Sequence, residues 1–445
     1  MLLNIEKLIY GGDGLARVSE EDGRKKAVFV PFVLEGEEVE ARIVETKRNF
    51  ARAAVEEIVL PSSERVVPGC CYFERCGGCH YQHTGYEHQL AVKAAILKEN
   101  LQRIARQELD TELQIHASPP WNYRNRSRLK VVTEPEFALG YYKFNSHQLL
   151  PVEQCPISSP LINRAISACW QLGPTSFHGV SEIQFFVNED DTRLLIELSC
   201  ARETTKVEAQ KAADHLQAAI PHAVGVAAFA SGRESTANDG PATDRPTRIG
   251  PAVTRDDGPL ATAGNAHLDY HVAGQNYRVS AGAFFQVNRH MTQQLLQIVT
   301  ENESGKTALD LYAGVGLFTC ALAKQFEKVV AVESLPISHS DLRYNAPENV
   351  KAVRSMAEQY LKNVAGKAQP DLVVLDPPRS GLGESVIHSL VRLGVPRVTY
   401  VSCDPATLSR DLSHLKAAGY AVRRAHLVDL FPQTYHLESV FHLVR

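Results

Sequence analysis

The sequence lacks any run of about 20 apolar residues that could span a membrane, and its first residues form no apolar leader segment. It also lacks a strong charge of either sign, because 47 Lys and Arg residues nearly balance 51 Asp and Glu residues, for a net charge of -4. This balance excludes a globally basic coat protein for nucleic acid, although it allows a local basic face. We therefore expect a soluble, cytoplasmic protein.

The composition also lacks the bias of a disordered or fibrous protein. With 44% hydrophobic and 22% charged residues, it is typical of globular proteins. The 445 residues predict two to four domains, each with a core of its own, at roughly 150 residues per domain.

Disulfide bonds are not expected, because the nine cysteines are odd in number and no secretion signal precedes them. Cys70, Cys76 and Cys79 instead follow the pattern Cys-x5-Cys-x2-Cys, with two glycines that let the backbone fold around a ligand. Cys155 can supply a fourth thiolate, and Cys71 could take the place of Cys70. Four thiolates suit zinc or an iron–sulfur cluster, and the spacing does not choose between them. The alternative is a turn with unligated thiols.

Residues 1–58 are predicted to form a small β-barrel. Short apolar segments at 27–33, 39–44 and 51–59 are separated by turns that contain glycine. Nine basic residues against twelve acidic ones over positions 1–60 give this region a charge of -3. A role in nucleic-acid binding would therefore need a localised basic face.

The segment from 65 to 280 is interpreted as a central α/β domain. Thr84 and Glu87 fit a capping box, and apolar residues at helical spacing predict an amphipathic helix over 86–107, which could pack on the C-terminal domain. Residues 231–265 contain no aromatic side chain and are rich in Gly and Pro, so we interpret them as a disordered insertion.

A local excess of basic residues follows the predicted helix. Positions 93–130 hold eight basic and four acidic residues. Arg124, Arg126 and Arg128 alternate along a presumed strand, so their side chains share one face. Such a row can contact phosphates, and the alternative is a solvated strand face.

Alternating strands and helices over 281–445 predict an α/β domain with a parallel, Rossmann-like sheet. An apolar strand leads into a turn with Gly314 and Gly316, where a ligand can approach the backbone closely. Glu333 ends the next strand and is placed to bind ribose hydroxyls. Thr319 stands where a dinucleotide fingerprint has its third glycine, so S-adenosylmethionine fits better than NAD. The alternative is a purely structural turn.

Two further strands and a late loop carry reactive groups toward the same edge of the sheet. Asp376 follows an apolar strand and precedes two prolines that fix the loop. Cys403 ends the next strand, where a thiol is a candidate nucleophile, although a lone cysteine there is more often a core residue. Glu438 offers a second carboxylate in a loop before the final strand.

Together these motifs resemble the RNA uracil-5-methyltransferase family, in particular its 23S ribosomal RNA branch, which has an N-terminal TRAM domain and an iron–sulfur cluster. The resemblance spans nearly the whole chain. It is carried by the four cysteines, Tyr123-Arg-Asn-Arg126, Phe285-Gln-Val-Asn288, Asp310-Leu-Tyr-Ala-Gly-Val-Gly316, Asp376-Pro-Pro-Arg379, Ser402-Cys-Asp-Pro405 and Phe431-Pro-Gln-Thr-Tyr-His-Leu-Glu438.

The resemblance implies a covalent methylation of uracil C5, with Cys403 as the nucleophile and Glu438 as the base. It implies an OB-like RNA-binding barrel, a backbone grip by Arg124 and Arg126, and a [4Fe-4S] cluster rather than zinc. The cluster ligands would be Cys70, Cys76, Cys79 and Cys155. The residues expected at the S-adenosylmethionine site are Gln286, Tyr312, Gly314, Gly316, Glu333 and Asp376.

Two departures from the family pattern bear on the cofactor turn. Ala313 replaces the family's usual cysteine, which should leave binding intact because the backbone makes the approach, and Leu317 stands where some relatives have a polar contact.

The expected partner is 23S ribosomal RNA with a base that can be unstacked, and not DNA or a membrane. The protein is expected to be a monomer. The alternatives are a transfer-RNA uracil-54 methyltransferase, a non-catalytic RNA-binding factor and an NAD-dependent enzyme.

Overall fold

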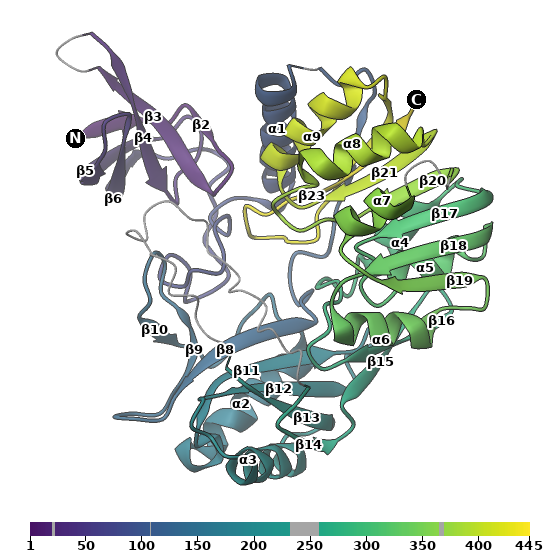
Figure 1. Cartoon of the computed structure of the whole chain (residues 1–445). Helices are drawn as coiled ribbons and strands as arrows, with labels where there is room; N and C mark the ends of the chain where they lie inside the picture. The colour runs from purple at the N-terminus through teal and green to yellow at the C-terminus, as the bar shows by residue number, and fades with distance from the viewer. Residues whose placement is uncertain (20–22, 107, 232–257, 365–368) are drawn as a thin grey trace.

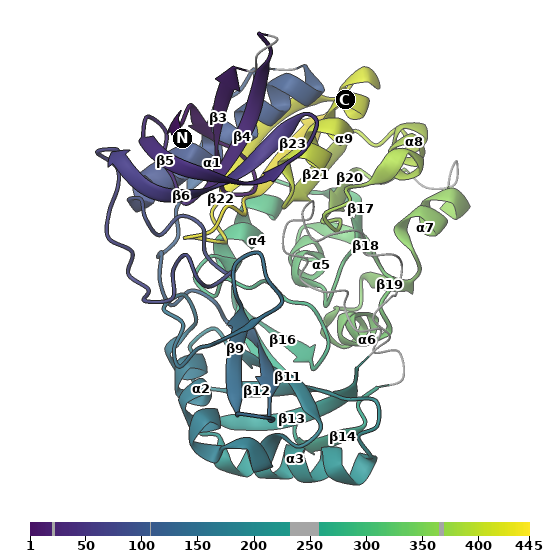
Figure 2. The ribbon, with the colours of Figure 1, turned by 90° about the vertical axis from the view of Figure 1, so that its left-hand side faces the viewer.

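The computed structural model describes residues 1–19, 23–106, 108–231, 258–364 and 369–445. These residues form three large sheets, one each from the N-terminal, central and C-terminal parts of the chain, and a separate two-stranded ribbon (Figure 1). In both views the N-terminal and C-terminal sheets lie next to each other, with the central sheet at the opposite end (Figure 2). None of the described helices is both long enough and apolar enough to cross a membrane.

The N-terminal sheet has six strands in the order β1-β5-β6-β4-β3-β2. Its core is made of small β-branched and alanine side chains such as Val28, Val30, Val39 and Ala41, all fully buried. The strands predicted from the apolar segments are confirmed, while closure into an OB-like barrel stays a prediction. The strands are β1 (Leu2–Asn4), β2 (Lys7–Leu8), β3 (Asp13–Ser19), β4 (Lys25–Pro31), β5 (Glu38–Thr46) and β6 (Phe50–Leu60).

The central sheet has seven strands in the order β10-β9-β8-β11-β12-β13-β14 and packs against two helices. Residues 261–264, expected in a disordered insertion over 231–265, form β14 and pair with β13, so that prediction extended too far; 232–257 lie outside the described residues. The elements are β8 (Arg126–Val132), β9 (Ala138–Tyr142), β10 (Leu149–Pro151), α2 (Pro160–Leu172), a 3-10 turn (Pro174–Phe177), β11 (Val180–Val187), β12 (Leu194–Cys200), α3 (Lys206–Ala219), β13 (Ala223–Ala230) and β14 (Ala261–Gly264).

The C-terminal sheet has eight strands in the order β19-β18-β17-β20-β21-β23-β22-β7, with β23 antiparallel to both neighbours. Its central strands are nearly continuous apolar runs whose successive side chains point to opposite faces of the sheet, so the two faces contribute to two separate cores. One core takes in α7, α8 and α9, and the other takes in α4, α5 and the ribbon of β15 and β16.

The bounds of these elements agree with the alternating pattern predicted for this region. They are β15 (His267–Val272), β16 (Gln275–Ser280), α4 (Thr292–Thr300), β17 (Gly305–Leu311), α5 (Leu317–Leu322), β18 (Phe326–Glu333), α6 (Pro336–Asn345), β19 (Val350–Arg354), α7 (Ala357–Val364), β20 (Leu372–Leu375), α8 (Gly383–Leu393), β21 (Arg397–Ser402), α9 (Pro405–Ala417), β22 (Ala421–Val428) and β23 (Glu438–Val444). The predicted strands before Gly314, Asp376 and Cys403 are therefore confirmed.

The helix predicted over 86–107 is α1 (Tyr86–Asn100), continued by one π-helical turn (Leu101–Ala105). It packs on α9, and β7 (Leu113–His116) then extends the C-terminal sheet in parallel with β22. The predicted capping box is wrong. Gly85 is the N-cap, and the Thr84 hydroxyl instead donates to the Glu64 carbonyl at 3.1 Å, a partner that lies 20 residues away.

Candidate active site

The carboxyl end of β17 leads into a sharply turned backbone. Tyr312, Gly314 and Gly316 all have positive φ angles, of 64°, 56° and 97°. A Cβ atom at Gly314 would meet nothing within 4 Å, so the turn faces open space. Glu333, at the end of β18, accepts hydrogen bonds from the Gly314 amide at 2.9 Å and the Leu335 amide at 2.7 Å. Residues predicted for the cofactor site thus meet at one edge of the sheet.

Two buried carboxyl groups lie behind and beside this turn. Burial raises the pKa of Asp310 to about 7, and the Thr319 hydroxyl donates to its carboxylate at 2.5 Å. The threonine that replaces the third fingerprint glycine therefore has a structural partner. Burial also raises the pKa of Asp376 to about 7, while the Gln286 amide, 3.5 Å away, counteracts this rise.

Cys403 and Glu438 come together from two neighbouring strands. Cys403 follows β21, and Glu438 is the first residue of β23, where it pairs with Val428. The prediction that Glu438 lies in a loop before the final strand is therefore wrong. Its carboxyl group is buried, and its Oε1 has no hydrogen-bond partner among the described residues. An acceptor in this state can receive a proton from a ligand at little further desolvation cost.

The electrostatics of this pair favour the neutral forms in the ligand-free site. Burial, together with the neighbouring Glu438 and Asp376, raises the pKa of Cys403 to about 12. Burial and Asp376 also raise the pKa of Glu438 well above its usual value. The Arg379 guanidinium lowers both pKa values. A thiol, two carboxyl groups and one guanidinium thus lie close enough to influence one another's ionisation.

Sequence reasoning missed three residues around Cys403. Arg379 ends the Asp-Pro-Pro-Arg segment, and its Nη2 lies 3.3 Å from the Nδ1 of His436. Arg379 and His436 both belong to motifs on which the family resemblance rests, so the sequence could have indicated them as site residues. The Tyr10 hydroxyl donates to the Cys403 carbonyl at 3.2 Å. No local pattern could have found this contact, because 393 residues separate the two.

The segment between β22 and β23, which leads to Glu438, is held from outside the C-terminal domain. The Lys93 ammonium of α1 donates to the Asp429 carboxylate at 2.6 Å, and both side chains are fully buried. The backbone amides of His80 and Tyr81 donate to the Gln433 carbonyl at 2.9 and 3.0 Å. Since His80 directly follows Cys79, the cysteine segment contacts the chain that presents Glu438.

The four predicted ligand cysteines are electrostatic neighbours. Burial raises the pKa of Cys76 to about 12, and Cys155 and Cys70 raise it further. Burial likewise raises the pKa of Cys79, with Cys155 as the next cause. Cys71 is exposed on the surface, whereas Cys70 is half-buried. Within the described part of the chain, no group of three or more His, Cys, Asp or Glu side chains is arranged to hold a metal ion.

The predicted arginine row is confirmed in part. Arg126 and Arg128 alternate along β8 and share its less buried face, whereas Arg124 precedes the strand and lies near Cys155 and Cys79. The Nη1 of Arg126 donates to the Ala283 carbonyl at 2.7 Å. Contacts of Arg124 and Arg126 with RNA stay predictions, but the two side chains have different protein surroundings.

Comparisons with known proteins agree with this arrangement. Residues 266–445 match the family model described as tRNA (Uracil-5-)-methyltransferase, and residues 1–55 match the TRAM domain. The chain is 32% identical over 446 residues to an uncharacterized RNA methyltransferase of Aquifex aeolicus, covering 98% of this chain and 97% of that one. A second RNA methyltransferase, from Thermosynechococcus vestitus, is 30% identical over 98% of this chain and 96% of its own.

A solved structure that resembles the whole chain is the tRNA (uracil-54, C5)-methyltransferase of Pyrococcus abyssi in complex with S-adenosyl-L-homocysteine. The TM-score is 0.73 at 21% sequence identity, and the match covers 100% of both chains. The extent of the sequence matches and the two family models lead to one assignment: the chain belongs to the RNA methyltransferases, its C-terminal part matches the tRNA (Uracil-5-)-methyltransferase model, and it carries a TRAM domain at its N-terminal end.

Proposed function

We propose that this protein transfers a methyl group from S-adenosylmethionine to carbon 5 of a uracil in 23S ribosomal RNA, through a covalent adduct on Cys403. The observation that carries the proposal is the meeting of Cys403, Glu438 and Asp376 at the carboxyl edge of the sheet, beside the open turn at Gly314. Ligands of parallel α/β sheets bind at this edge. The bound S-adenosylhomocysteine of the structurally similar enzyme supports the choice of methyl donor.

Cys403 and Glu438 each carry out one part of the proposed reaction. The Cys403 thiolate adds to C6 of uracil. The electron pair of the C5–C6 double bond moves to C5 and the adjoining carbonyl as an enolate, which makes C5 nucleophilic. S-adenosylmethionine, when bound, would supply the methyl group that C5 takes and leave as neutral S-adenosylhomocysteine, and its positive charge would favour the thiolate. Glu438, in the carboxylate form that the positive charge of the bound methyl donor favours, then removes the proton from C5. The C5–C6 double bond re-forms and the Cys403 thiolate leaves, which returns the nucleophile.

The raised pKa values determine when this chemistry can begin. With its pKa near 12, the Cys403 thiol is neutral in the ligand-free site at pH 7. Glu438 and Asp376 oppose its ionisation, and Arg379 favours it. The free enzyme is therefore protected from unproductive thiol chemistry, and the thiolate forms when ligands change the charge around it.

The four cysteines fit an iron–sulfur cluster better than they fit an ordinary turn. Cys155 lies close enough to Cys70, Cys76 and Cys79 to raise the pKa of all three, whereas Cys71 is exposed. The Nε of Arg124 is buried beside them without a hydrogen-bond partner in the described structure. An N–H group in this position could donate a hydrogen bond to a sulfur atom of an anionic cluster. Such a hydrogen bond would tune the stability and the reduction potential of the cluster.

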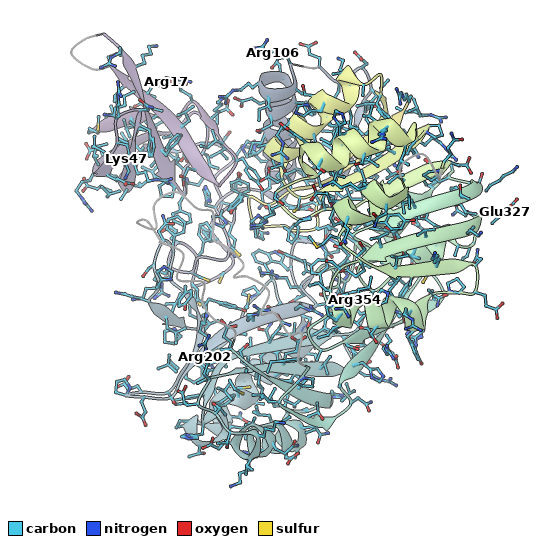
Figure 3. All side chains as sticks on the ribbon, in the orientation of Figure 1. Arg17, Lys47, Arg106, Arg202, Glu327 and Arg354 are labelled. Carbon is cyan, nitrogen blue, oxygen red and sulfur yellow. The ribbon has the colours of Figure 1, made fainter. Side chains whose placement is uncertain are left out.

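A cavity between the N-terminal domain and α1 offers a place for RNA. Its volume is about 560 Å³, and Lys7, Arg17, Arg103, Tyr10 and Phe29 contribute to its lining. Figure 3 shows Arg17 on the N-terminal domain, where it pairs with Glu6. Basic and aromatic side chains together bind the backbone and the unstacked bases of RNA. Because Tyr10 also contacts the Cys403 backbone, the cavity adjoins the catalytic residues.

The test uses anaerobically purified protein, labelled S-adenosylmethionine and, in separate reactions, unmodified 23S ribosomal RNA and transfer RNA. Nucleoside analysis should show label in 5-methyluridine from the ribosomal RNA. The choice of ribosomal RNA rests on the TRAM domain combined with the four-cysteine set. Label in another nucleoside, or no label in either RNA with S-adenosylmethionine bound, would contradict the proposed reaction.

Transfer RNA is the second candidate substrate, because the solved structure that matches the whole chain is that of a tRNA (uracil-54, C5)-methyltransferase. Label in transfer RNA alone, lost when its uracil 54 is replaced by cytosine, would establish that alternative. The catalytic roles of Cys403 and Glu438 would be the same for either RNA.

A further inference from the structure

We propose that Tyr10, a residue of the N-terminal domain, positions the Cys403 nucleophile for attack. The inference rests on the proposed function, since it takes Cys403 as the nucleophile. It assigns to the N-terminal domain a part in the chemical step, in addition to any contact with RNA. The surroundings of Tyr10 carry the argument.

The Tyr10 side chain is anchored at both its ring and its hydroxyl. The hydroxyl donates to the Cys403 carbonyl at 3.2 Å. The ring packs edge-on against Tyr435, with 5.4 Å between the centroids and 87° between the planes. Tyr435 in turn contacts the rings of His80 and His436, at 4.6 and 4.2 Å between centroids. One aromatic cluster therefore joins the N-terminal domain, the cysteine segment and the catalytic loop, which is the segment between β22 and β23 that leads to Glu438.

The turn that carries Tyr10 is shaped to reach this place. It joins β2 to β3, and the Ile9 amide donates to the Asp13 carbonyl at 3.0 Å across it. Gly11 and Gly12 both have positive φ angles, of 112° and 93°. A Cβ atom at Gly12 would lie 3.0 Å from the Cβ of His80, which is closer than most side chains tolerate. The two glycines thus permit the close approach that places Tyr10 beside Cys403.

The carbonyl that Tyr10 contacts lies at the junction between β21 and α9. Cys403 stands between the last residue of β21 and Asp404, the N-cap of α9, whose carboxylate accepts from the Ala406 and Thr407 amides. The Cys403 carbonyl therefore lies outside both the strand ladder and the first helical turn. A hydrogen bond from Tyr10 fixes the Cys403–Asp404 peptide plane, and through it the direction in which Sγ projects.

The Tyr10 hydroxyl keeps its proton over the whole range of pH in which the enzyme can be assayed. Burial raises its pKa, and the nearby Asp404 raises it further. Tyr10 therefore acts as a permanent donor to the carbonyl, and it takes no part in proton transfer. Its removal should lower the rate of the chemical step without changing the shape of the pH profile.

The test compares Tyr10→Phe with the wild type in single-turnover methyl transfer at saturating RNA and S-adenosylmethionine. Tyr10→Phe keeps the ring and its packing on Tyr435 but removes the donor. We expect a rate about three- to tenfold lower, in keeping with the loss of one net hydrogen bond. The dissociation constants for RNA and S-adenosylmethionine should stay within about twofold, and the pH profile should keep its shape.

Tyr420→Phe is the matched control. The Tyr420 hydroxyl also donates to a backbone carbonyl, that of Val395, at 2.8 Å, and this contact lies before β21, at the strand's far end from Cys403. This variant should turn over at the wild-type rate, and thermal unfolding should show that both variants are folded.

The inference is overturned if Tyr10→Phe reacts at the wild-type rate, or if it loses RNA affinity with no change in the saturated rate. The second result would make Tyr10 an RNA contact. Cys403→Ala, assayed in parallel, separates this inference from the proposed function. If Cys403→Ala is inactive and Tyr10→Phe is normal, the role of Tyr10 alone is wrong; methylation by Cys403→Ala would remove the basis of both.

Discussion

The carboxyl edge of the C-terminal sheet and the cysteine segment over residues 70–83 are both clusters of reactive groups with half-buried thiols, yet they are built differently. At the edge, Cys403 and Glu438 are held by adjacent strands of one sheet. The cysteine segment has no helix or strand, and its backbone is held by turns and by contacts with distant loops. Burial raises the pKa of thiols in both, to about 12 for Cys403 and for Cys76.

The difference teaches which site depends on its ligand for its shape. Strand pairing fixes β21 as far as Ser402 and β23 from Ser439 whether or not a substrate is bound. The cysteine segment is held by turn and loop hydrogen bonds and has no such ladder, so a bound cluster would add to its order. The two regions meet where the His80 and Tyr81 amides donate to the Gln433 carbonyl. Changes in the cysteine segment should therefore lower the rate of methyl transfer, but by less than changes at Cys403 or Glu438.

The largest effect is expected at the sheet edge, from Cys403→Ala. Without the nucleophile, C5 of uracil is not activated, and we expect methyl transfer to fall by roughly 10⁴-fold or more, with no RNA–protein adduct. Adduct formation is followed by denaturing gel electrophoresis and turnover by label transfer. The cluster content of the variant should equal that of the wild type. Normal turnover would eliminate Cys403 as the nucleophile.

Glu438→Gln should separate the two halves of the reaction. Methylation precedes removal of the C5 proton, so the variant should accumulate a methylated RNA adduct while turnover falls by about 10²- to 10⁴-fold. Mass spectrometry of the trapped peptide and nucleotide measures the methyl group directly. A variant that releases product freely would show that another group is the base.

Cys79→Ser perturbs the other region. We expect loss of iron and sulfide together with a rate about tenfold lower, since the amides that hold Gln433 lose their support. S-adenosylmethionine affinity should be unchanged, because the cofactor turn is held by the paired strands β17 and β18 of the C-terminal sheet. Cys71→Ser, at an exposed cysteine, is the control and should match the wild type in both properties. An unaltered rate after complete loss of iron would disprove the coupling.

Arg379→Ala should change the ionisation of Cys403. Arg379 lowers the thiol pKa, so its removal raises that pKa and reduces the thiolate fraction at any given pH. Alkylation of Cys403 by iodoacetamide, located by peptide mass spectrometry, should be about tenfold slower at each pH below 10. Arg392→Ala, in the last turn of α8, should leave the rate unchanged. Faster alkylation would reverse the sign of the proposed charge effect.

The sequence predicts much of the sheet edge, because its strands are continuous apolar runs that end in Gly, Asp or Cys. It places Glu438 wrongly, since the pairing of that residue with Val428 is a tertiary contact. It also overlooks β7, whose four residues gain their place from pairing with β22 rather than from an apolar pattern. The contact of Tyr10 with Cys403 and the position of Arg124 beside the cysteines likewise depend on how distant segments pack.

The covalent step is the central claim, and RNA that contains 5-fluorouridine tests it most directly. Fluorine at C5 replaces the proton that Glu438 would remove, so the reaction should stop at a methylated adduct that survives denaturation. We predict that mass spectrometry will find this adduct on Cys403, and that it will form only when S-adenosylmethionine is present to complete the methylation. Methylation of ordinary uridine without any adduct, or an adduct on another cysteine, would contradict the account.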